Sequence, residues 1–448
     1  MRANSSTSGS RPRRRVRARR GAAVGVSLAA LAAGATTGAS TATAAQPRAA
    51  AAAAADCSAA YRIEQKLSGG TTWRMCWRYD GKAGLVLEKI SYQPKGETKP
   101  IKVLNSARLG QIHVPYDDGS VEYDDLTGFG FAQGLMPLKA TECPGGTIKT
   151  VKVPEAWDPQ NPNVKGLCTT TRSRGHAYRM QGDTANKVYQ AQGKDLLVYT
   201  VNQVGWYEYM TEWRFQDDGT VTMNVGATGS LSYDDYDAGD GRGWPIGKGG
   251  RAKATSHSHN VFWRLDFALD GSTKNRVEQY DSTVTAPASG DRAPKTKTSV
   301  TKVSKELAGD VKAYRWWRMV SATGKNKDGH ARSYEIVPGV STKYPGRSYT
   351  KHDVYVTEYA ACEKFATHNP GCGNGYPKSV DKWVGGQTLK HPITWMNVGF
   401  HHIARDEDQQ PMPVHWQGFS IVPRDVTAMN PLTPSELAWQ NGHWQPRS

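Results

Sequence analysis

The chain has 448 residues and a formal net charge of +16, from 57 lysines and arginines against 41 acidic residues. Eight of the basic residues are arginines at positions 2–20, so the chain after residue 44 has 49 basic residues against 41 acids and a mild net charge of +8. No arginine-rich helix or Gly-rich phosphate loop accompanies this charge, which argues against a nucleic-acid partner.

Residues 1–44 have the features of a secretion signal. The arginines precede a small apolar run over 22–35, and Ala42-Thr43-Ala44 fits a cleavage site. This run is shorter than the ~20 residues that span a bilayer, and no later stretch is longer, so we predict no membrane span. We expect a mature chain outside the cytoplasm. The Arg19-Arg20 pair leaves the general secretory and the twin-arginine routes open.

Residues 45–56 are mostly alanine and have no periodic apolar face, so we interpret them as a tether to a folded domain over 57–448. All 6 cysteines lie in that domain, and an even number in an exported chain predicts disulfides. Loop lengths favour pairing in sequential order, although the sequence alone leaves the connectivity open. The cysteines are Cys57, Cys76, Cys143, Cys168, Cys362 and Cys372.

Short segments of alternating apolar and polar residues fill the folded domain, and Asp-Gly turns separate them. Few windows show helical periodicity, and no internal repeat is evident. We therefore predict an all-β fold, one large antiparallel β-sandwich with few short helices. The clearest predicted strands cover 84–92, 196–201, 208–215, 221–225 and 261–269.

Two histidines with one residue between them lie in strand-like sequence. Side chains on a strand alternate between its faces, so His257 and His259 point to the same face. Two imidazoles in this arrangement suit Cu(II) or Zn(II). Such a pair is a weak signal in a chain with 12 histidines. Spacing alone does not choose the third ligand among His391, His402 and His415.

Two further segments indicate a function only when their order along the chain is considered. Taken alone, the aromatic segment 204–209 is packing sequence, and the acidic segment 116–126 is a hairpin turn. With the stretch 395–414, however, they resemble the catalytic domain of copper amine oxidases over roughly residues 83–430. Further similar segments, in the same order, are 218–220, 226–229, 334–339, 351–357 and 369–371.

The resemblance implies a copper site and a protein-derived cofactor. In the family's closing motif, the metal ligand is the histidine before an aliphatic residue, which here is His402 beside Ile403. Copper would then be bound by His257, His259 and His402, and Tyr207 would be oxidised by copper and O2 to topaquinone. The implied reaction converts a primary amine, O2 and water into an aldehyde, ammonia and H2O2. The resemblance also pairs Cys143 with Cys168.

The same comparison implies roles for residues of the acidic segment. Asp125 corresponds to the general base, with Asp124 as a rival because the connection after Tyr116 is shorter here than in the family. Tyr123 corresponds to a gate in the substrate channel, and Tyr116 to a hydrogen-bond partner of the quinone oxygen. Enclosure would raise the pKa of such a carboxyl toward a value useful for proton abstraction.

Three positions depart from the family pattern. Trp206 replaces the asparagine before the quinone tyrosine, and Gln203 replaces a threonine. The indole of Trp206 either holds the quinone ring in place by packing or changes the reaction rate and the shape of substrate that fits. At the family's calcium site, the sequence reads Asp266-Phe267-Ala268 and His391, with two carboxylates lost. We therefore expect no calcium there.

Two alternative functions remain open on the sequence. One is a copper-binding scaffold without catalysis, in which Tyr207 stays a tyrosine. The other is an oxidase of lysyl side chains in peptides, because the small domains that precede the catalytic domain in most members have no counterpart here and the channel would be more open. The resemblance also implies a homodimer held by β-hairpin arms, with one arm expected over 316–338.

Overall fold

The computed structural model describes residues 57–182, 187–232, 241–373 and 375–440. The predicted secretion signal over 1–44 and the tether over 45–56 lie outside the described residues. Within the described ranges, none of the helices is long and apolar enough to cross a membrane.

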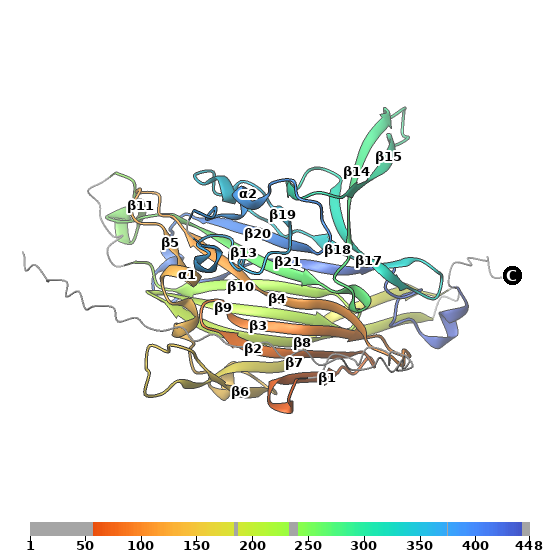
Figure 1. The fold of residues 1–448 in the computed structure, drawn as a ribbon, viewed down its shortest axis with the longest axis horizontal. Coiled ribbons are helices and arrows are strands. Elements are labelled where there is room, and N and C mark those ends of the chain that lie inside the picture. The colour runs from red at the N-terminus through yellow and green to blue at the C-terminus, as the bar shows by residue number, and fades with distance from the viewer. Residues whose placement is uncertain (1–56, 183–186, 233–240, 374, 441–448) are drawn as a thin grey trace, which may run out of the picture. The chain divides into compact units, whose positions relative to one another are not determined.

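Antiparallel strands make up most of the described residues, and they form two large sheets and one small one (Figure 1). Sheet A contains, in spatial order, β1 (Arg62–Lys66), β2 (Thr72–Asp80), β3 (Gly84–Gln93), β4 (Ile101–Val114), β13 (His257–Phe267), β20 (Pro392–His402), β19 (Val354–Glu358) and β16 (Leu307–Gly309), with β5 (Tyr123–Asp124) paired to β4. Sheet B contains, in spatial order, β15 (Lys295–Val303), β14 (Arg276–Ala286), β17 (Arg315–Lys325), β18 (Ala331–Val337), β21 (Met412–Arg424), β10 (Val221–Gly229), β9 (Tyr207–Gln216), β8 (Val188–Val204), β7 (Asn163–Gln181) and β6 (Thr147–Lys152). The small sheet pairs β11 (Trp244–Ile246) with β12 (Ala252–Ala254).

Helices are few and short in the described part of the chain. The α-helices are α1 (Asp125–Gly128) and α2 (Val380–Trp383). Short 3-10 helices cover Ala59–Tyr61, Phe131–Gly134, Ala140–Glu142, Lys248–Gly250, Leu269–Gly271, Ser348–Thr350, Pro370–Cys372, Asp406–Asp408 and Ser435–Gln440. The predicted all-β fold with few short helices is confirmed.

The predicted strands all fall on observed strands. The segment 84–92 is β3, 196–201 lies within β8, 208–215 is β9 and 221–225 begins β10. The prediction over 261–269 was placed too late, because β13 begins at His257 and ends at Phe267. Asp270 has a φ of 55° and Gly271 a φ of 88°, and this turn conformation ends the strand.

A shared core fills the space between the two large sheets, because one cluster of buried side chains draws residues from both. Trp213 of β9 packs edge-on against Trp263 of β13 with ring centroids 5.3 Å apart. All residues of β13 are buried, so both of its faces are covered. One face carries His257, His259 and Trp263 toward sheet B, and the other carries Phe262 into a second cluster with Trp395.

Three disulfides join the cysteines in sequential order, as predicted. They are Cys57–Cys76, Cys143–Cys168 and Cys362–Cys372.

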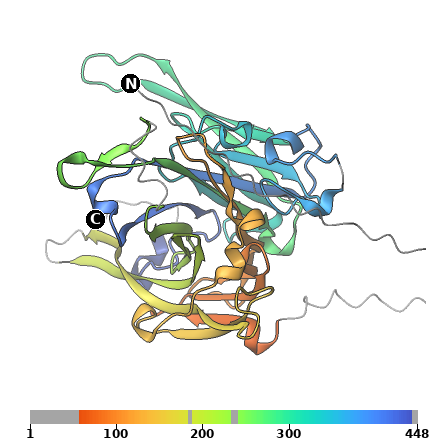
Figure 2. The ribbon, with the colours of Figure 1, turned by 90° about the vertical axis from the view of Figure 1, so that its left-hand side faces the viewer.

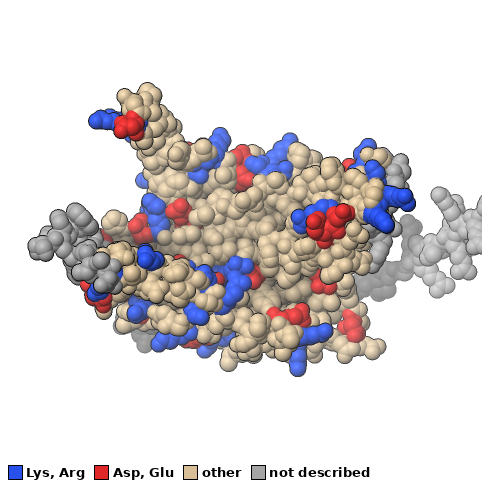
Figure 3. Space-filling model, turned by 180° about the vertical axis from the view of Figure 1, so that it is seen from behind, with Lys and Arg blue, Asp and Glu red and all other residues tan. Residues whose placement is uncertain are grey.

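The hairpin that projects from the end of sheet B is not the segment predicted to be an arm. The segment 316–338 does form a hairpin, but its strands pair with β14 and β21 inside sheet B. The projecting hairpin is β14–β15, which Figures 1 and 2 show apart from the rest of the fold. Eight of the nine residues of β15 are exposed. Figure 3 shows basic and acidic residues interspersed over the opposite face and together at the hairpin tip.

Candidate functional site

Strand pairing brings three histidines together. His257 of β13 lies directly opposite His402 of β20 in the antiparallel register, and His259 is two residues along the same strand. The three ring nitrogens lie within 4.8 Å of one another, and all three side chains are buried. The Nε2 atoms of His257 and His259 are 3.0 Å apart. The predicted ligand set therefore converges on one point.

A buried carboxylate orients the third histidine. The Nε2 of His402 lies 2.9 Å from Oδ2 of Asp408, which is fully buried. Burial alone would raise the pKa of Asp408, but the hydrogen bond and charge of His402 and the backbone N–H of Arg405 outweigh it and lower that pKa. The ionised carboxylate therefore accepts a hydrogen bond from His402 Nε2–H, and the lone pair of His402 Nδ1 faces the other two histidines.

The electrostatics of this cluster fit a metal ion. Burial, followed by the charges of neighbouring histidines, lowers the pKa values of His257 and His259 well below their usual range. Both imidazoles are therefore neutral at neutral pH and present lone pairs. Together with His402 Nδ1, these two nitrogens form a donor set that suits Cu(II) or Zn(II).

A two-residue hairpin loop sets the position of Tyr207. Val204 at the end of β8 pairs with Tyr207 at the start of β9, so Gly205 and Trp206 form the loop between them. Gly205 has a φ of 57°, a conformation that favours glycine at the first loop position. On the other side, Gly229 of β10 pairs with Tyr207, and a Cβ there would lie 2.4 Å from the carbonyl oxygen of Trp206. Only glycine fits at that close approach.

The Tyr207 phenol points into the histidine cluster and is 4% exposed. Its oxygen lies 2.7 Å from His257 Nε2 and 3.0 Å from His402 Nδ1. The sulfur of Met412 is 3.9 Å from the same oxygen. The predicted quinone precursor is thus in direct contact with two of the predicted copper ligands.

A small cavity of about 100 Å³ lies beside Tyr207, and Asp125 forms part of its wall. Asp125 is 2% exposed, and its environment raises its pKa to about 7. Burial is the main cause, the hydrogen bond from Tyr209 acts in the opposite direction, and the charge of Asp124 adds to the increase. A carboxyl group with this pKa is suited to accepting a proton near neutral pH.

Asp124 points away from that cavity. Its carboxylate lies 3.0 Å from His113 Nδ1 and 2.7 Å from His368 Nδ1, and it is not among the residues that line the cavity. The geometry thus favours Asp125 over its rival.

The remaining predicted site residues line the same cavity. The indole N–H of Trp206 donates to the Tyr116 oxygen at 3.1 Å, and the Tyr116 ring stacks on His257 with centroids 4.7 Å apart. Tyr123 contacts both Tyr116 and Trp206 edge-on. Trp206 therefore belongs to the cavity wall and connects through Tyr116 to the histidine cluster.

The other candidate histidines lie outside the three-histidine cluster. His391 Nε2 is 2.7 Å from Oδ1 of Asp266, whose Oδ2 accepts from the Asn105 amide at 2.9 Å. His415 Nε2 is 3.8 Å from Asp408 and belongs to a second group with His402 and Asp408. Both oxygens of Asp266, at the family's calcium position, are thus engaged by protein.

Sequence reasoning missed three residues of the site. Tyr209 hydrogen-bonds Asp125 and lies 3.3 Å from His259 Nδ1, and its position two residues after Tyr207 on one strand was a usable signal. Phe129 lines the cavity, and Asp408 orients His402. Asp408 lies within the closing stretch 395–414 but received no role from the sequence, and no sequence pattern points to Phe129.

Fold and site together define an antiparallel β-sandwich in which three buried histidines, one of them oriented by a carboxylate, surround a tyrosine oxygen. Residues 64–439 match the family model described as "Copper amine oxidase, enzyme domain". Because that match covers well over half of the chain, the chain belongs to the copper amine oxidase family.

Individual relatives are distant and longer. "Histamine oxidase" of Arthrobacter globiformis is 26% identical over 411 residues, which cover 83% of this chain and 57% of the relative. "Amine oxidase [copper-containing] alpha 2, peroxisomal" of Arabidopsis thaliana is 23% identical over 417 residues, 83% of this chain and 60% of the relative. The crystal structure of a copper-containing benzylamine oxidase from Hansenula polymorpha has a TM-score of 0.69 at 21% identity, over 82% of this chain and 62% of that one. The chain thus spans about 60% of the length of these relatives.

Proposed function

We propose that this chain is a secreted primary-amine oxidase that uses Cu(II) and a topaquinone derived from Tyr207. The observation that carries the proposal is the position of the Tyr207 oxygen, 2.7 Å from His257 Nε2 and 3.0 Å from His402 Nδ1. His257, His259 and His402 would hold the copper. When bound, copper supplies the redox chemistry that oxygenates the phenol with O2, and the quinone supplies the carbonyl that captures the amine.

Asp125 is the group that accepts a proton in this reaction. It lies in the wall of the cavity beside Tyr207, and its raised pKa of about 7 suits removal of a proton from the carbon next to the amine nitrogen. Tyr209 donates a hydrogen bond to this carboxylate and fixes its direction. Burial of the pair keeps water away from the reacting centre.

The cavity lining supports an amine with an apolar or aromatic substituent. The walls around Asp125 are mainly aromatic and aliphatic, so they would contact hydrocarbon and leave Asp125 as the main polar contact. The lining residues with apolar surfaces are Val114, Tyr116, Tyr123, Phe129, Val204 and Trp206.

Secretion is part of the proposal and rests on two features. The arginines and apolar run of residues 1–44 resemble a secretion signal. Three disulfides in the folded part fit an oxidising compartment.

Turnover of defined amines tests the reaction. Copper-loaded protein is expected to release one aldehyde and one H2O2 for each O2 consumed with benzylamine, and Tyr207→Phe is expected to abolish the activity. A lysyl peptide measured in parallel tests the alternative substrate class. If the wild-type protein binds copper but turns over neither amine, the oxidase proposal fails and the copper-binding scaffold takes its place.

A further inference from the structure

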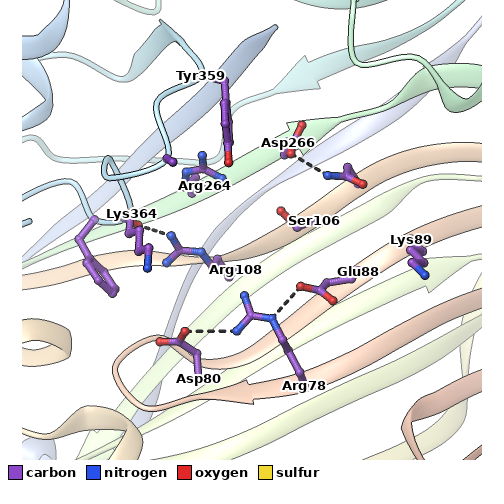
Figure 4. Close-up of a pocket in the computed structure, with 13 residues that line it drawn as sticks. Arg78, Asp80, Glu88, Lys89, Ser106, Arg108, Arg264, Asp266, Tyr359 and Lys364 are labelled. Atoms are coloured by element: carbon purple, nitrogen blue, oxygen red, sulfur yellow. Dashed lines mark hydrogen bonds and ion pairs between the residues drawn. The ribbon is translucent and has the colours of Figure 1, made fainter. Parts of the chain in front are cut away.

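A second, larger cavity of about 460 Å³ lies on sheet A (Figure 4). Strands β2, β3, β4 and β13 and the segment 359–365 form its walls. Arg264 and Asp266 of β13 line it, and they point to the face of that strand opposite His257 and His259. This cavity is therefore separate from the histidine site.

Two buried arginines line this cavity without a carboxylate partner. Arg108 and Arg264 are each 7% exposed, and neither has an acidic oxygen within 4.0 Å among the residues that the structure describes. Arg108 donates to the backbone carbonyls of Leu109, at 3.2 Å, and Lys364. Arg264 donates through Nε to the Glu363 carbonyl at 3.3 Å.

Aromatic rings hold both guanidinium groups in place. Arg108 lies 5.1 Å from the centre of the Phe365 ring, and Arg264 lies 5.4 Å from that of Trp395. Such contacts fix the plane of a guanidinium and leave N–H groups at its edge for other partners. The Nη groups of Arg264 form no hydrogen bond with any of the residues that the structure describes.

The acids that line the same cavity are bound elsewhere. Asp80 and Glu88 lie 3.2 and 2.7 Å from Arg78, and Asp266 pairs with His391 at 2.7 Å. Burial first, and then the charge of Arg264, lowers the pKa of Arg108, while the charge of Asp80 acts in the opposite direction and only partly offsets them. Burying such charges is costly unless a partner compensates them.

We propose that this cavity binds a small oxyanion, a phosphate or a carboxylate, between Arg108 and Arg264. The forked N–H groups of arginine match the spacing of two oxygens on one such group. Lys364 and Ser106 also line the cavity and can supply further donors (Figure 4). The anion would act as the contacting counter-ion that Arg108 and Arg264 lack, since Asp80 and Asp266 act on them only from a distance.

Anion titration of the copper-loaded protein tests the site. Inorganic phosphate and acetate are titrated separately by calorimetry at constant ionic strength, with chloride as the background salt. Saturable binding of one anion per chain is expected, and the tighter of the two identifies the ligand class. Arg108→Gln and Arg264→Gln should each weaken binding at least about tenfold, because each removes charge-assisted hydrogen bonds. Arg78→Lys is the matched control, because Arg78 lines the same cavity but is already paired with acids, and lysine keeps the charge that pairs with them. The anion affinity of this variant should stay close to wild type.

Two results would overturn the proposal: no saturable binding to the wild-type protein, or weakening by Arg78→Lys equal to that by Arg108→Lys and Arg264→Lys. Arg108→Lys and Arg264→Lys keep the charge and remove the fork, so they preserve folding if the glutamine variants do not fold. Unchanged affinity in both lysine variants would also contradict the site. Tyr207→Phe should bind the anion as the wild type does. The anion site can therefore be confirmed or rejected independently of the oxidase proposal.

Discussion

The Asp125 carboxyl is enclosed beside Tyr207, whereas the adjacent Asp124 pairs with His113 and His368 outside the cavity. Asp125→Asn should lower kcat by about 10²- to 10⁴-fold, since an amide cannot accept the proton. Copper content and quinone formation should not change. Steady-state kinetics with benzylamine measure the effect, and Asp124→Asn is the matched control. If Asp124→Asn is the slower variant, the assignment of the base is wrong.

The raised pKa of Asp125 also predicts a pH dependence. The carboxyl must be ionised to act as a base, so kcat/KM should rise with pH and level off above about pH 7. A profile measured from pH 5 to 9 checks this. A rate that is flat through pH 7 would contradict the assignment.

The same pKa links Asp125 to stability. The folded-state pKa of about 7 exceeds the ordinary value of 3.8, so the folded state binds the proton more tightly and loses stability as pH rises between these values. Asp125→Asn removes this loss. Its advantage over wild type in the free energy of unfolding should grow by up to about 3 kcal/mol from pH 5 to pH 8. Denaturation of copper-free protein measures it, and parallel stability curves would refute it.

Asp408 should affect copper affinity although it is not one of the three predicted copper ligands. It accepts a hydrogen bond from His402 Nε2–H at 2.9 Å and so directs Nδ1 toward the other histidines. Asp408→Asn should weaken copper affinity about 10- to 100-fold in competition with a chelator. The neighbouring exposed residue provides the control, because Glu407→Gln should bind copper as the wild type does. Equal copper affinities of Asp408→Asn and Glu407→Gln would contradict this role of Asp408.

At the residue level, sequence reasoning reached the site only in part. The spacing of His257 and His259 placed both on one face of a strand, which β13 bears out. Spacing could not choose His402, because its approach depends on the register of β13 with β20, and only the family resemblance selected it. Asp408 was missed because its contact with His402 crosses a turn that has no distinctive pattern.

At the scale of elements, strand alternation and Asp-Gly turns predicted most of the fold. Asp218-Gly219 lies between β9 and β10, where Gly219 has a φ of 95° and Asp218 accepts from the Thr220 N–H at 2.9 Å. What local patterns could not predict is which strands become neighbours. β4, β13 and β20 lie side by side although more than a hundred residues separate each from the next.

Strand β13 should be the most sensitive element, since both of its faces are buried. Trp263→Ala removes a fully buried indole that packs on Trp213, and it should lower the free energy of unfolding by about 3–5 kcal/mol. Val300→Ala in the exposed strand β15 is the control and should stay within about 0.5 kcal/mol of wild type. Denaturant unfolding measures both. Similar losses in the two variants would contradict the description of the core.

At the scale of the whole molecule, the projecting hairpin is a candidate for the arm of the homodimer that the family resemblance implies. An isolated two-stranded hairpin is marginally stable in water, and most of β15 is exposed, so a partner would stabilise it. Replacing residues 287–294 and the adjoining ends of β14 and β15 with a short turn should convert a dimer into a monomer in sedimentation experiments. Copper affinity should be retained, because no histidine of the cluster lies there. A wild-type chain that sediments as a monomer would contradict the expected homodimer.

The central claim is that copper and O2 convert Tyr207 into a quinone within the three-histidine cluster. The most direct test is the absorption spectrum of copper-loaded, aerated protein, recorded with and without phenylhydrazine and beside Tyr207→Phe. We predict a visible quinone band that shifts with the hydrazine and is absent from the variant. A wild-type protein that binds copper yet stays without this band would contradict the claim.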